Sequence, residues 1–160
     1  MEFESITYYK TPIGMARIVG DSSGISSITV IDGVEKGSTE IPKSLQECVK
    51  QLDEYFQKKR TTFNLKLNPQ GTEFQKEVWQ SLQQIPYGTT RSYQEQSEAL
   101  GDVKAVRAVA SANAKNPLLI VVPCHRVIGS DGALTGYSGG LWRKRWLLEH
   151  ENPPEQQSLF

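Results

Sequence analysis

The sequence has few cysteines, no long apolar run and no net charge, and each absence excludes a class of protein. Cys48 and Cys124 are its two cysteines, too few for a disulfide framework or for a zinc site made of several cysteines. The longest run of strongly apolar residues, Leu118 to Val122, is far shorter than a membrane span. Eighteen basic residues balance eighteen acidic ones, which disfavours a uniformly basic nucleic-acid-binding protein. The chain shows no charged start followed by an apolar segment, so we expect no secretory signal and a cytoplasmic protein.

The chain divides at a turn-rich tetrapeptide, Asn68-Pro69-Gln70-Gly71. We take residues 1–70 as an N-terminal α/β domain, residues 71–151 as a second domain, and residues 152–160 as a flexible tail. Neither part contains a repeat or a low-complexity run. The fold class that we predict is α/β (α+β).

The first part contains strand patterns and one helix pattern. A β-prone opening segment precedes predicted strands at 14–19 and 25–31, which are separated by a hairpin loop. Apolar residues on one face predict a helix over 44–60, with Cys48 as a core residue. Alternation over 63–67 predicts a further strand. Together these patterns predict a small mixed sheet covered by a helix.

The second part begins with a helix start signal. Thr72 is followed three residues later by Gln75, which predicts a capping box and a helix that ends before Pro86. Two shorter helices follow, over 92–100 and 103–115, separated by a glycine that favours a left-handed turn. This spacing predicts either a helix-turn-helix or an ordinary helical hairpin.

The second of these short helices carries three alanines on one face. Ala105, Ala108 and Ala112 lie at i, i+3 and i+7, and Arg107 lies beside them. Small side chains let a partner approach the helix closely. That partner is either the protein's own core or a nucleic-acid groove into which Arg107 is inserted.

The reactive residues follow the apolar run. Residues 118–122 are typical of a buried strand, and Pro123-Cys124-His125-Arg126-Val127 comes next. A lone cysteine is commonly an inert core residue, but His125 and Arg126 supply the base or the positive field that activates a thiol. Neighbouring residues of an extended chain point to opposite sides, so contact between Cys124 and His125 needs a bend at Pro123 or a bridging water.

This five-residue motif, with Gly136-Tyr137-Ser138-Gly139-Gly140-Leu141 after it, resembles the O6-alkylguanine-DNA alkyltransferases, also called methylated-DNA–protein-cysteine methyltransferases. The resemblance extends from about Phe74 to Glu151. It implies an RNase H-like first domain and a winged-helix-like helix-turn-helix in the second. It implies DNA repair by stoichiometric transfer of an alkyl group from O6-alkylguanine to Cys124, with nucleotide flipping and irreversible self-inactivation. Whether O4-alkylthymine or larger alkyl groups are accepted stays open.

The resemblance also implies roles for individual residues. Cys124 takes the alkyl group as a thioether, His125 polarises a water that activates the thiol, and Glu151 orients His125. Tyr93 helps to flip the nucleotide and protonates the departing guanine, and Arg107 fills the gap in the base stack. The other implied residues are Ala105, Ala108, Ala112 and Arg126 for DNA contact, Asn116 as a hinge, and Pro123, Val127, Tyr137 and Ser138 around the substrate pocket.

The resemblance implies partners as well. We expect a monomer that binds double-stranded DNA containing alkylated bases and that needs no cofactor. The first part has one cysteine and no histidine, so we expect no metal, although some relatives carry zinc there. The last five residues, 156–160, look like the short peptide by which bacterial DNA-repair proteins hold the sliding clamp. Docking on the protein's own surface and a disordered tail are the alternatives.

Two other functions are compatible with the residues. A cysteine hydrolase that uses Cys124 and His125 would turn over repeatedly. A non-catalytic DNA-binding module would bind without covalent change. The charge distribution favours DNA contact around the proposed reactive residues, because residues 104–145 carry seven basic residues against Asp131 alone. If a few of them contact phosphates, log K falls with log salt at a slope of roughly −3 to −5.

Overall fold

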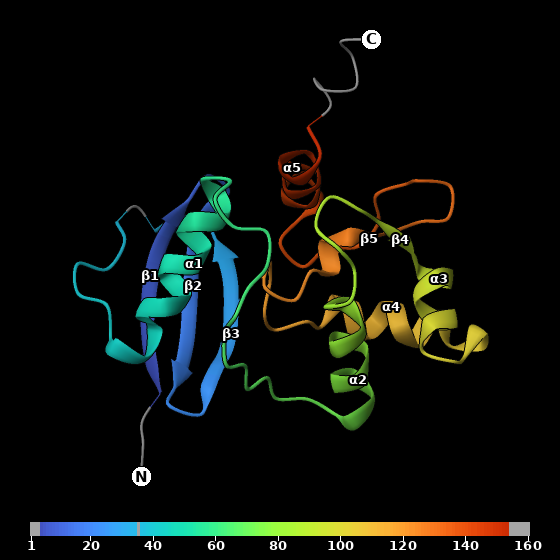
Figure 1. Ribbon diagram of the computed structural model, residues 1–160, viewed down its shortest axis with the longest axis horizontal. Helices are drawn as coiled ribbons and strands as arrows, with labels where there is room; N and C mark the ends of the chain where they lie inside the picture. Colours follow the sequence, from blue (N-terminus) through green and yellow to red (C-terminus); the bar gives the residue numbers. More distant parts are fainter. Residues whose placement is uncertain (1–3, 35, 154–160) are drawn as a thin grey trace. The chain divides into compact units, whose positions relative to one another are not determined.

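The computed structural model describes residues 4–34 and 36–153 (Figure 1). The chain forms two compact units. Unit 1 consists of the residues up to Gln70 together with Pro117–Val121, and unit 2 consists of Gly71–Asn116 and the residues from Val122 onward. Within the described ranges, no helix is long and apolar enough to cross a membrane.

Unit 1 is built on a three-stranded antiparallel sheet of β1 (Ser5–Thr11), β2 (Gly14–Asp21) and β3 (Gly24–Ile31), in that order. Gly14 and Gly24 begin β2 and β3 with φ of 123° and 133°, a conformation that side chains other than glycine rarely adopt. The strands predicted over 14–19 and 25–31 are confirmed.

One helix covers this sheet, as predicted. A 3-10 turn, η1 (Lys43–Leu45), leads into α1 (Gln46–Phe56), which lies across the sheet in Figure 1. Its buried residues include Cys48, which is 1% exposed. The helix ends four residues before the predicted end because Lys58 takes a left-handed φ of 62°. Lys59 N then donates to Glu54 O at 2.8 Å, which closes a Schellman cap.

Two predicted strands are wrong. In the 63–67 segment only Leu67 forms a bridge, with Ile25 of β3, and in the 118–122 segment only Leu118 does so, with Ile28. Both bridges are parallel, so the sheet is mixed at β3. The 118–122 run turns back instead of extending: Ile120 has a φ of 74°, and Val121 N donates to Leu119 O at 2.8 Å. This is the strained form of the γ-turn, which no strand accommodates.

Unit 2 begins with α2 (Glu73–Leu82), which has the predicted capping box between Thr72 and Gln75. Val78 of this helix packs with Val109 and Ala112 of α4 (Val106–Ala114) in a buried cluster. Trp79 Nε1 also donates to Ala112 O at 2.9 Å. The indole therefore satisfies its buried donor at the contact between these two helices.

The two short helices form a helix-turn-helix, as one of the two interpretations predicted. These are α3 (Tyr93–Ala99) and α4, which follows the 3-10 turn η2 (Val103–Ala105). Gly101 between them has a φ of 85°. The helices are joined by a buried amide pair, since Gln96 Nε2 donates to Asn113 Oδ1 at 2.9 Å and Asn113 Nδ2 to Gln96 Oε1 at 2.7 Å.

A two-residue parallel ladder links the helix-turn-helix to the reactive motif. β4 (Arg91–Ser92) immediately precedes α3 and pairs with β5 (Val127–Ile128), which immediately follows the 3-10 turn η3 (Cys124–Arg126). The predicted closing helix is α5 (Leu141–Glu151). Unit 2 thus places the start of α3 beside the residues that follow Cys124.

Candidate active site

The reactive motif is a tight turn and not the end of a strand. Pro123 has φ −83° and ψ 63°, and Cys124 N donates to Val122 O at 2.8 Å, which is the geometry of an inverse γ-turn. The 3-10 turn η3 follows, in which Arg126 N donates to Pro123 O at 3.0 Å. The bend expected at Pro123 is therefore present.

Cys124 is a buried thiol, 7% exposed. Burial raises its pKa to about 11, although a side-chain hydrogen bond from Asn116 and the charge of Lys144 both oppose the rise. The Asn116 amide also donates to Val122 O at 2.8 Å and so closes the 117–121 loop. A thiol with this pKa keeps its proton at neutral pH, so a reaction at Cys124 needs a base.

His125 is placed to be that base. Its ring is fully buried, and its Nε2 lies 2.8 Å from Glu151 Oε2. A carboxylate is only an acceptor, so Nε2 carries the proton of the neutral ring and donates it. Burial lowers the pKa of His125, and the charges of Arg126 and Lys144 add to that effect against the opposing Glu151. Nδ1 has no partner among the described residues, which leaves its lone pair open to accept a proton.

Arg126 belongs to the same buried network. Its Nε donates to Glu151 Oε1 at 2.8 Å, its Nη2 to Glu151 Oε2 at 3.0 Å, and its Nη1 to Ile85 O at 2.7 Å. Arg126 is 6% exposed. The prediction that Arg126 contacts DNA is therefore wrong, because its guanidinium is buried and bonded to partners inside the protein.

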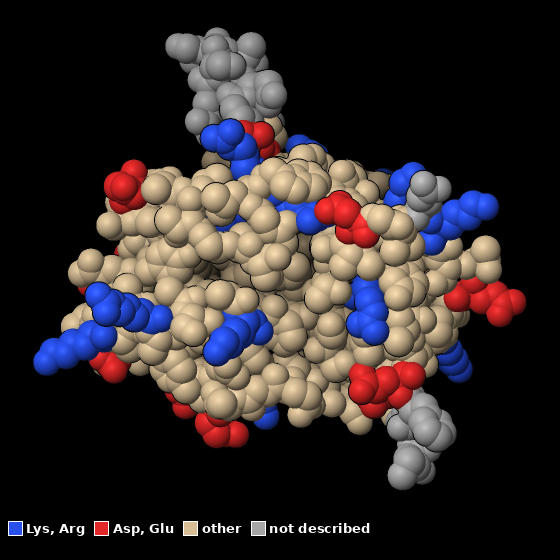
Figure 2. All heavy atoms as spheres, turned by 180° about the vertical axis from the view of Figure 1, so that it is seen from behind, with Lys and Arg blue, Asp and Glu red and all other residues tan. Residues whose placement is uncertain are grey.

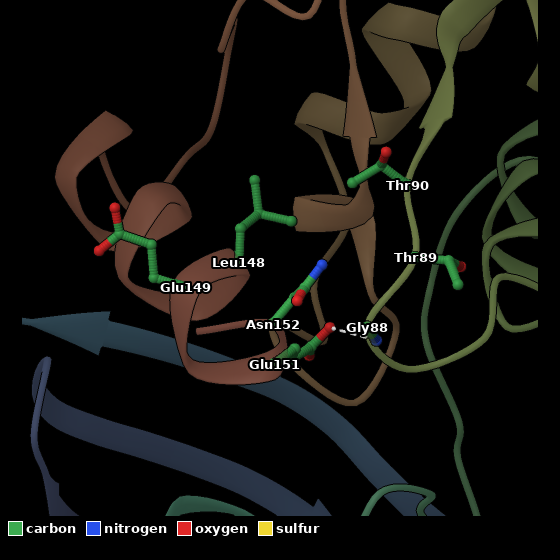
Figure 3. Close-up of a pocket in the computed structure, with 7 residues that line it drawn as sticks. All are labelled: Gly88, Thr89, Thr90, Leu148, Glu149, Glu151 and Asn152. Carbon is green, nitrogen blue, oxygen red and sulfur yellow. Dashed lines mark hydrogen bonds between the residues drawn. The ribbon is translucent and has the colours of Figure 1, made fainter. Parts of the chain in front are cut away.

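Glu151 is held from a further side by the loop before β4. Gly88 N donates to Glu151 Oε1 at 3.5 Å, at a surface hollow of about 300 Å³ (Figure 3). Burial alone would raise the pKa of Glu151, but the hydrogen bonds from His125 and Arg126 and the charge of Arg126 hold that pKa well below its usual range. The carboxylate stays ionised as a result. The hollow is lined by Gly88, Thr89, Thr90, Leu148, Glu149, Glu151 and Asn152.

Lys144 and Tyr93 meet at Thr135, a junction that sequence reasoning missed. Lys144 is fully buried, and its Nζ donates to Thr135 O at 2.6 Å. Thr135 Oγ1 donates to Tyr93 Oη at 3.1 Å. Burial lowers the pKa of Lys144 to about 8. The signal was present in the sequence, because Lys144, Leu147 and Glu151 lie at i, i+3 and i+7 on one helix face.

The predicted pocket residues lie after α4 (Asn116), just before η3 (Pro123), on β5 (Val127) and in the loop before α5 (Tyr137 and Ser138). Val127 is fully buried, Ser138 is exposed, and the Oη of Tyr137 is buried with no partner in the described part of the chain. Burial raises the pKa of Tyr137 well above its usual value. A Cβ on Gly139 would lie 2.9 Å from the Tyr137 ring, so the glycine lets the loop fold onto that ring.

The three alanines of the helix-turn-helix do not share one exposed face. Ala108 and Arg107 are exposed on α4, whereas Ala112 is 3% exposed and Ala105 packs against the same core cluster. The prediction of DNA contact is wrong for Ala112, because its side chain is buried against Val78. Only the exposed residues of α4, such as Arg107 and Ala108, remain available to contact a DNA groove.

Burial also reduces the number of basic residues in 104–145 that DNA could reach. Arg126, Arg143 and Lys144 are buried, and the exposed basic residues of 104–145 are Lys104, Arg107, Lys115 and Arg145. On the face drawn in Figure 2, acidic side chains stand among basic ones. The sequence count therefore overstates the charge that can meet phosphates.

Two ring side chains of α5 differ in exposure. His150 is 9% exposed and stacks on Trp146 with ring centroids 4.8 Å apart. Trp142 is 54% exposed, and the guanidinium of Arg143 lies over its ring. The proposed clamp peptide, 156–160, lies outside the described residues.

Unit 2 therefore combines a buried cysteine, a neutral histidine held by a carboxylate, and a helix-turn-helix. This combination defines the class of proteins that bring a cysteine nucleophile to a nucleic acid. The family model of the 6-O-methylguanine DNA methyltransferase DNA binding domain matches residues 73–153, and the model of the ribonuclease-like domain of the same methyltransferase matches residues 6–69. The chain belongs to this family.

Relatives match nearly the whole chain. The methylated-DNA–protein-cysteine methyltransferase of Methanosarcina barkeri is 46% identical over 149 residues, which cover 89% of this chain and 93% of that protein. The Mycobacterium leprae protein of the same name is 47% identical over 153 residues, 93% of each chain. A crystal structure of Mycobacterium tuberculosis OGT in complex with DNA matches with a TM-score of 0.81 and 43% identity over 90% of each chain.

Proposed function

We propose that this protein repairs DNA by transferring the alkyl group of an O6-alkylguanine to Sγ of Cys124. One observation carries the proposal: the residue after Cys124 is a buried histidine whose Nε2 is held by Glu151 at 2.8 Å while Nδ1 is open. The names of its relatives state methyl transfer from methylated DNA to a protein cysteine. Residues 1–70 then act as a structural domain, and residues 71–151 bind DNA and accept the alkyl group.

The transfer is a displacement at the alkyl carbon. Nδ1 of His125, through a bridging water, takes the thiol proton as Sγ attacks. The sulfur–carbon bond forms while the carbon–O6 bond breaks, and the departing guanine recovers one proton, so that thiol and O6-alkylguanine become thioether and guanine. The thioether has no group that frees the sulfur again. Each molecule therefore acts once and is consumed.

The helix-turn-helix delivers the base. A guanine inside a duplex is out of reach of a buried thiol, so the nucleotide leaves the stack at a cost of a few kcal/mol. Arg107, exposed on α4, enters the gap, and Tyr93 at the start of α3 assists the rotation and supplies a proton to the leaving guanine. Tyr137, Ser138, Val127 and Pro123 enclose the flipped base, and Asn116 acts as the hinge. Phosphate contacts, not base reading, supply the affinity, because damage has no fixed sequence context.

A stoichiometry measurement tests the proposal. A duplex with one O6-methylguanine is mixed in excess with the protein, and the repaired guanine is counted against protein. We expect one repaired base per molecule, and none for Cys124→Ala, which keeps its DNA affinity. Continued turnover would indicate the hydrolase instead, and binding without repair would indicate a non-catalytic module. Duplexes with O4-methylthymine or a benzyl group in place of methyl then define which lesions are accepted.

We propose further that Gln156 to Phe160 bind the sliding clamp. The support is the sequence itself, a polar tail that ends in the apolar pair Leu159-Phe160. Clamp affinity is measured for the full chain and for Leu159→Ala/Phe160→Ala. The double substitution is expected to abolish binding, and equal affinities would defeat this part of the proposal.

A further inference from the structure

We propose that Arg126 is a positioning residue of the transfer reaction: its guanidinium clamps the Glu151 carboxylate, so that Glu151 fixes the ring of His125 without driving it to the charged imidazolium. The inference rests on the proposed function, since it assigns the base of that reaction. It replaces the DNA contact that sequence reasoning gave to Arg126.

The geometry is that of a fork. Two nitrogens of Arg126 lie 2.8 and 3.0 Å from the two oxygens of Glu151, and a third donates to Ile85 O at 2.7 Å. The third bond fixes the plane of the guanidinium, so the carboxylate is held in one orientation. Glu151 Oε2 then accepts from His125 Nε2 at 2.8 Å. Each partner is buried, with side-chain exposures of 0% for His125, 1% for Glu151 and 7% for Arg126.

The charge of Arg126 decides which proton state this arrangement favours. A buried carboxylate alone beside an imidazole stabilises the imidazolium, which has no lone pair for the thiol proton. A guanidinium on the same carboxylate supplies the opposite charge, and Glu151 then needs only a hydrogen bond from a neutral ring. Among the described residues, the charged and titratable groups of this cluster are Glu151, Lys144 and Arg143 from α5, Cys124 and Arg126 from η3, Tyr87 before β4, and Tyr137 before α5.

Lysine cannot reproduce the arrangement. Its ammonium is a point charge, whereas the guanidinium matches both carboxylate oxygens and the Ile85 carbonyl in one plane. Arg126→Lys therefore keeps the charge and loses the fork, while Arg126→Gln loses the charge. Arg60→Gln is the matched control, because it also removes an arginine from an ion pair with a glutamate, here Glu54 at 3.0 Å in unit 1.

The experiment combines single-turnover rates on methylated duplex from pH 5 to 7.5 with NMR titration of the ¹⁵N-labelled His125 ring. This range stays below the pKa of Lys144, about 8. The rate rises with pH as His125 becomes neutral. In Arg126→Gln we expect the rising limb of the pH–rate profile and the His125 titration to move together to higher pH by about one unit or more. Below the wild-type midpoint the rate then falls about tenfold. Arg126→Lys moves the rising limb of the pH–rate profile by much less, and Arg60→Gln does not move it.

Two results overturn the inference. One is a folded Arg126→Gln whose limb and His125 titration stay at the wild-type pH. The other, which needs no variant, is a wild-type His125 that is an imidazolium at pH 7 or that carries its proton on Nδ1. If the wild-type protein transfers no methyl group at any pH, the proposed function fails, and the NMR titrations still decide what Arg126 does to His125.

Discussion

Unit 1 and unit 2 each bury one cysteine, and the surroundings of the two thiols differ. Cys48 on α1 is 1% exposed, and burial raises its pKa to about 12. Cys124 is 7% exposed with a pKa of about 11, because the Asn116 hydrogen bond and the Lys144 charge oppose burial there. Burial keeps both thiols protonated at rest. The comparison teaches that the neighbouring base, and not exposure, separates a core cysteine from an acceptor.

The largest effect is expected at Glu151. Without its carboxylate, His125 is no longer held in place as the base, and the surroundings of Cys124 come to resemble those of Cys48. Glu151→Gln leaves Arg126 buried without its counter-charge, which costs about 3–5 kcal/mol of stability. The same change frees the His125 ring, so the transfer rate falls by about 10² to 10⁴. Chemical denaturation and single-turnover kinetics measure the two losses. Glu54→Gln, which breaks the ion pair with Arg60 in unit 1, leaves the transfer rate unchanged; a similar fall in that variant would contradict the account.

Arg107 affects delivery of the base rather than chemistry at Cys124. Arg107→Ala removes the exposed arginine of α4. Transfer from duplex DNA should fall about tenfold, because no side chain then replaces the stacking that the flipped nucleotide gives up. Transfer from the free base O6-methylguanine needs no flipping and should keep its wild-type rate. An equal loss on both substrates would place Arg107 in the chemistry and refute this division of roles.

Salt dependence measures how much of the basic stretch is available to DNA. Four of its seven basic residues are exposed, so the plot of log K against log salt should have a slope no steeper than about −4. A fluorescence titration of duplex DNA at several salt concentrations gives the slope. A value near −7 would contradict the count of four, because it requires phosphate contacts from basic residues beyond these four.

The smallest difference is expected in the intrinsic reactivity of the two thiols. Thiolate forms as pH rises toward the pKa, so a raised pKa delays labelling to higher pH. Iodoacetamide should label both cysteines far more slowly at pH 8 than a free thiol with a pKa of about 8.5. As pH rises, Cys124 should react before Cys48, since its pKa is about 11 against about 12. Rapid labelling of Cys124 at pH 7 would contradict the resting thiol described above.

The sequence predicted the elements whose signals are local. Thr72 with Gln75 marked the start of α2, and Gly101 marked the turn of the helix-turn-helix. The strand prediction for 118–122 was wrong because an apolar run indicates burial but does not reveal backbone conformation. It could not show that Ile120 adopts a positive φ, which turns the chain. Arg126 and Lys144 were misjudged because their partners, Glu151 and Thr135, lie far away in the sequence or in an irregular loop. A count of charges does not reveal which cations are buried.

The residue that receives the alkyl group is the most direct test of the proposed reaction. The protein is incubated with an excess of duplex containing O6-methylguanine, digested, and the peptides that carry Cys124 and Cys48 are weighed. The account predicts one methyl group per chain, all of it on Cys124 and none on Cys48. A methyl group on Cys48, or an unmodified Cys124 peptide after repair of the guanine, would contradict it.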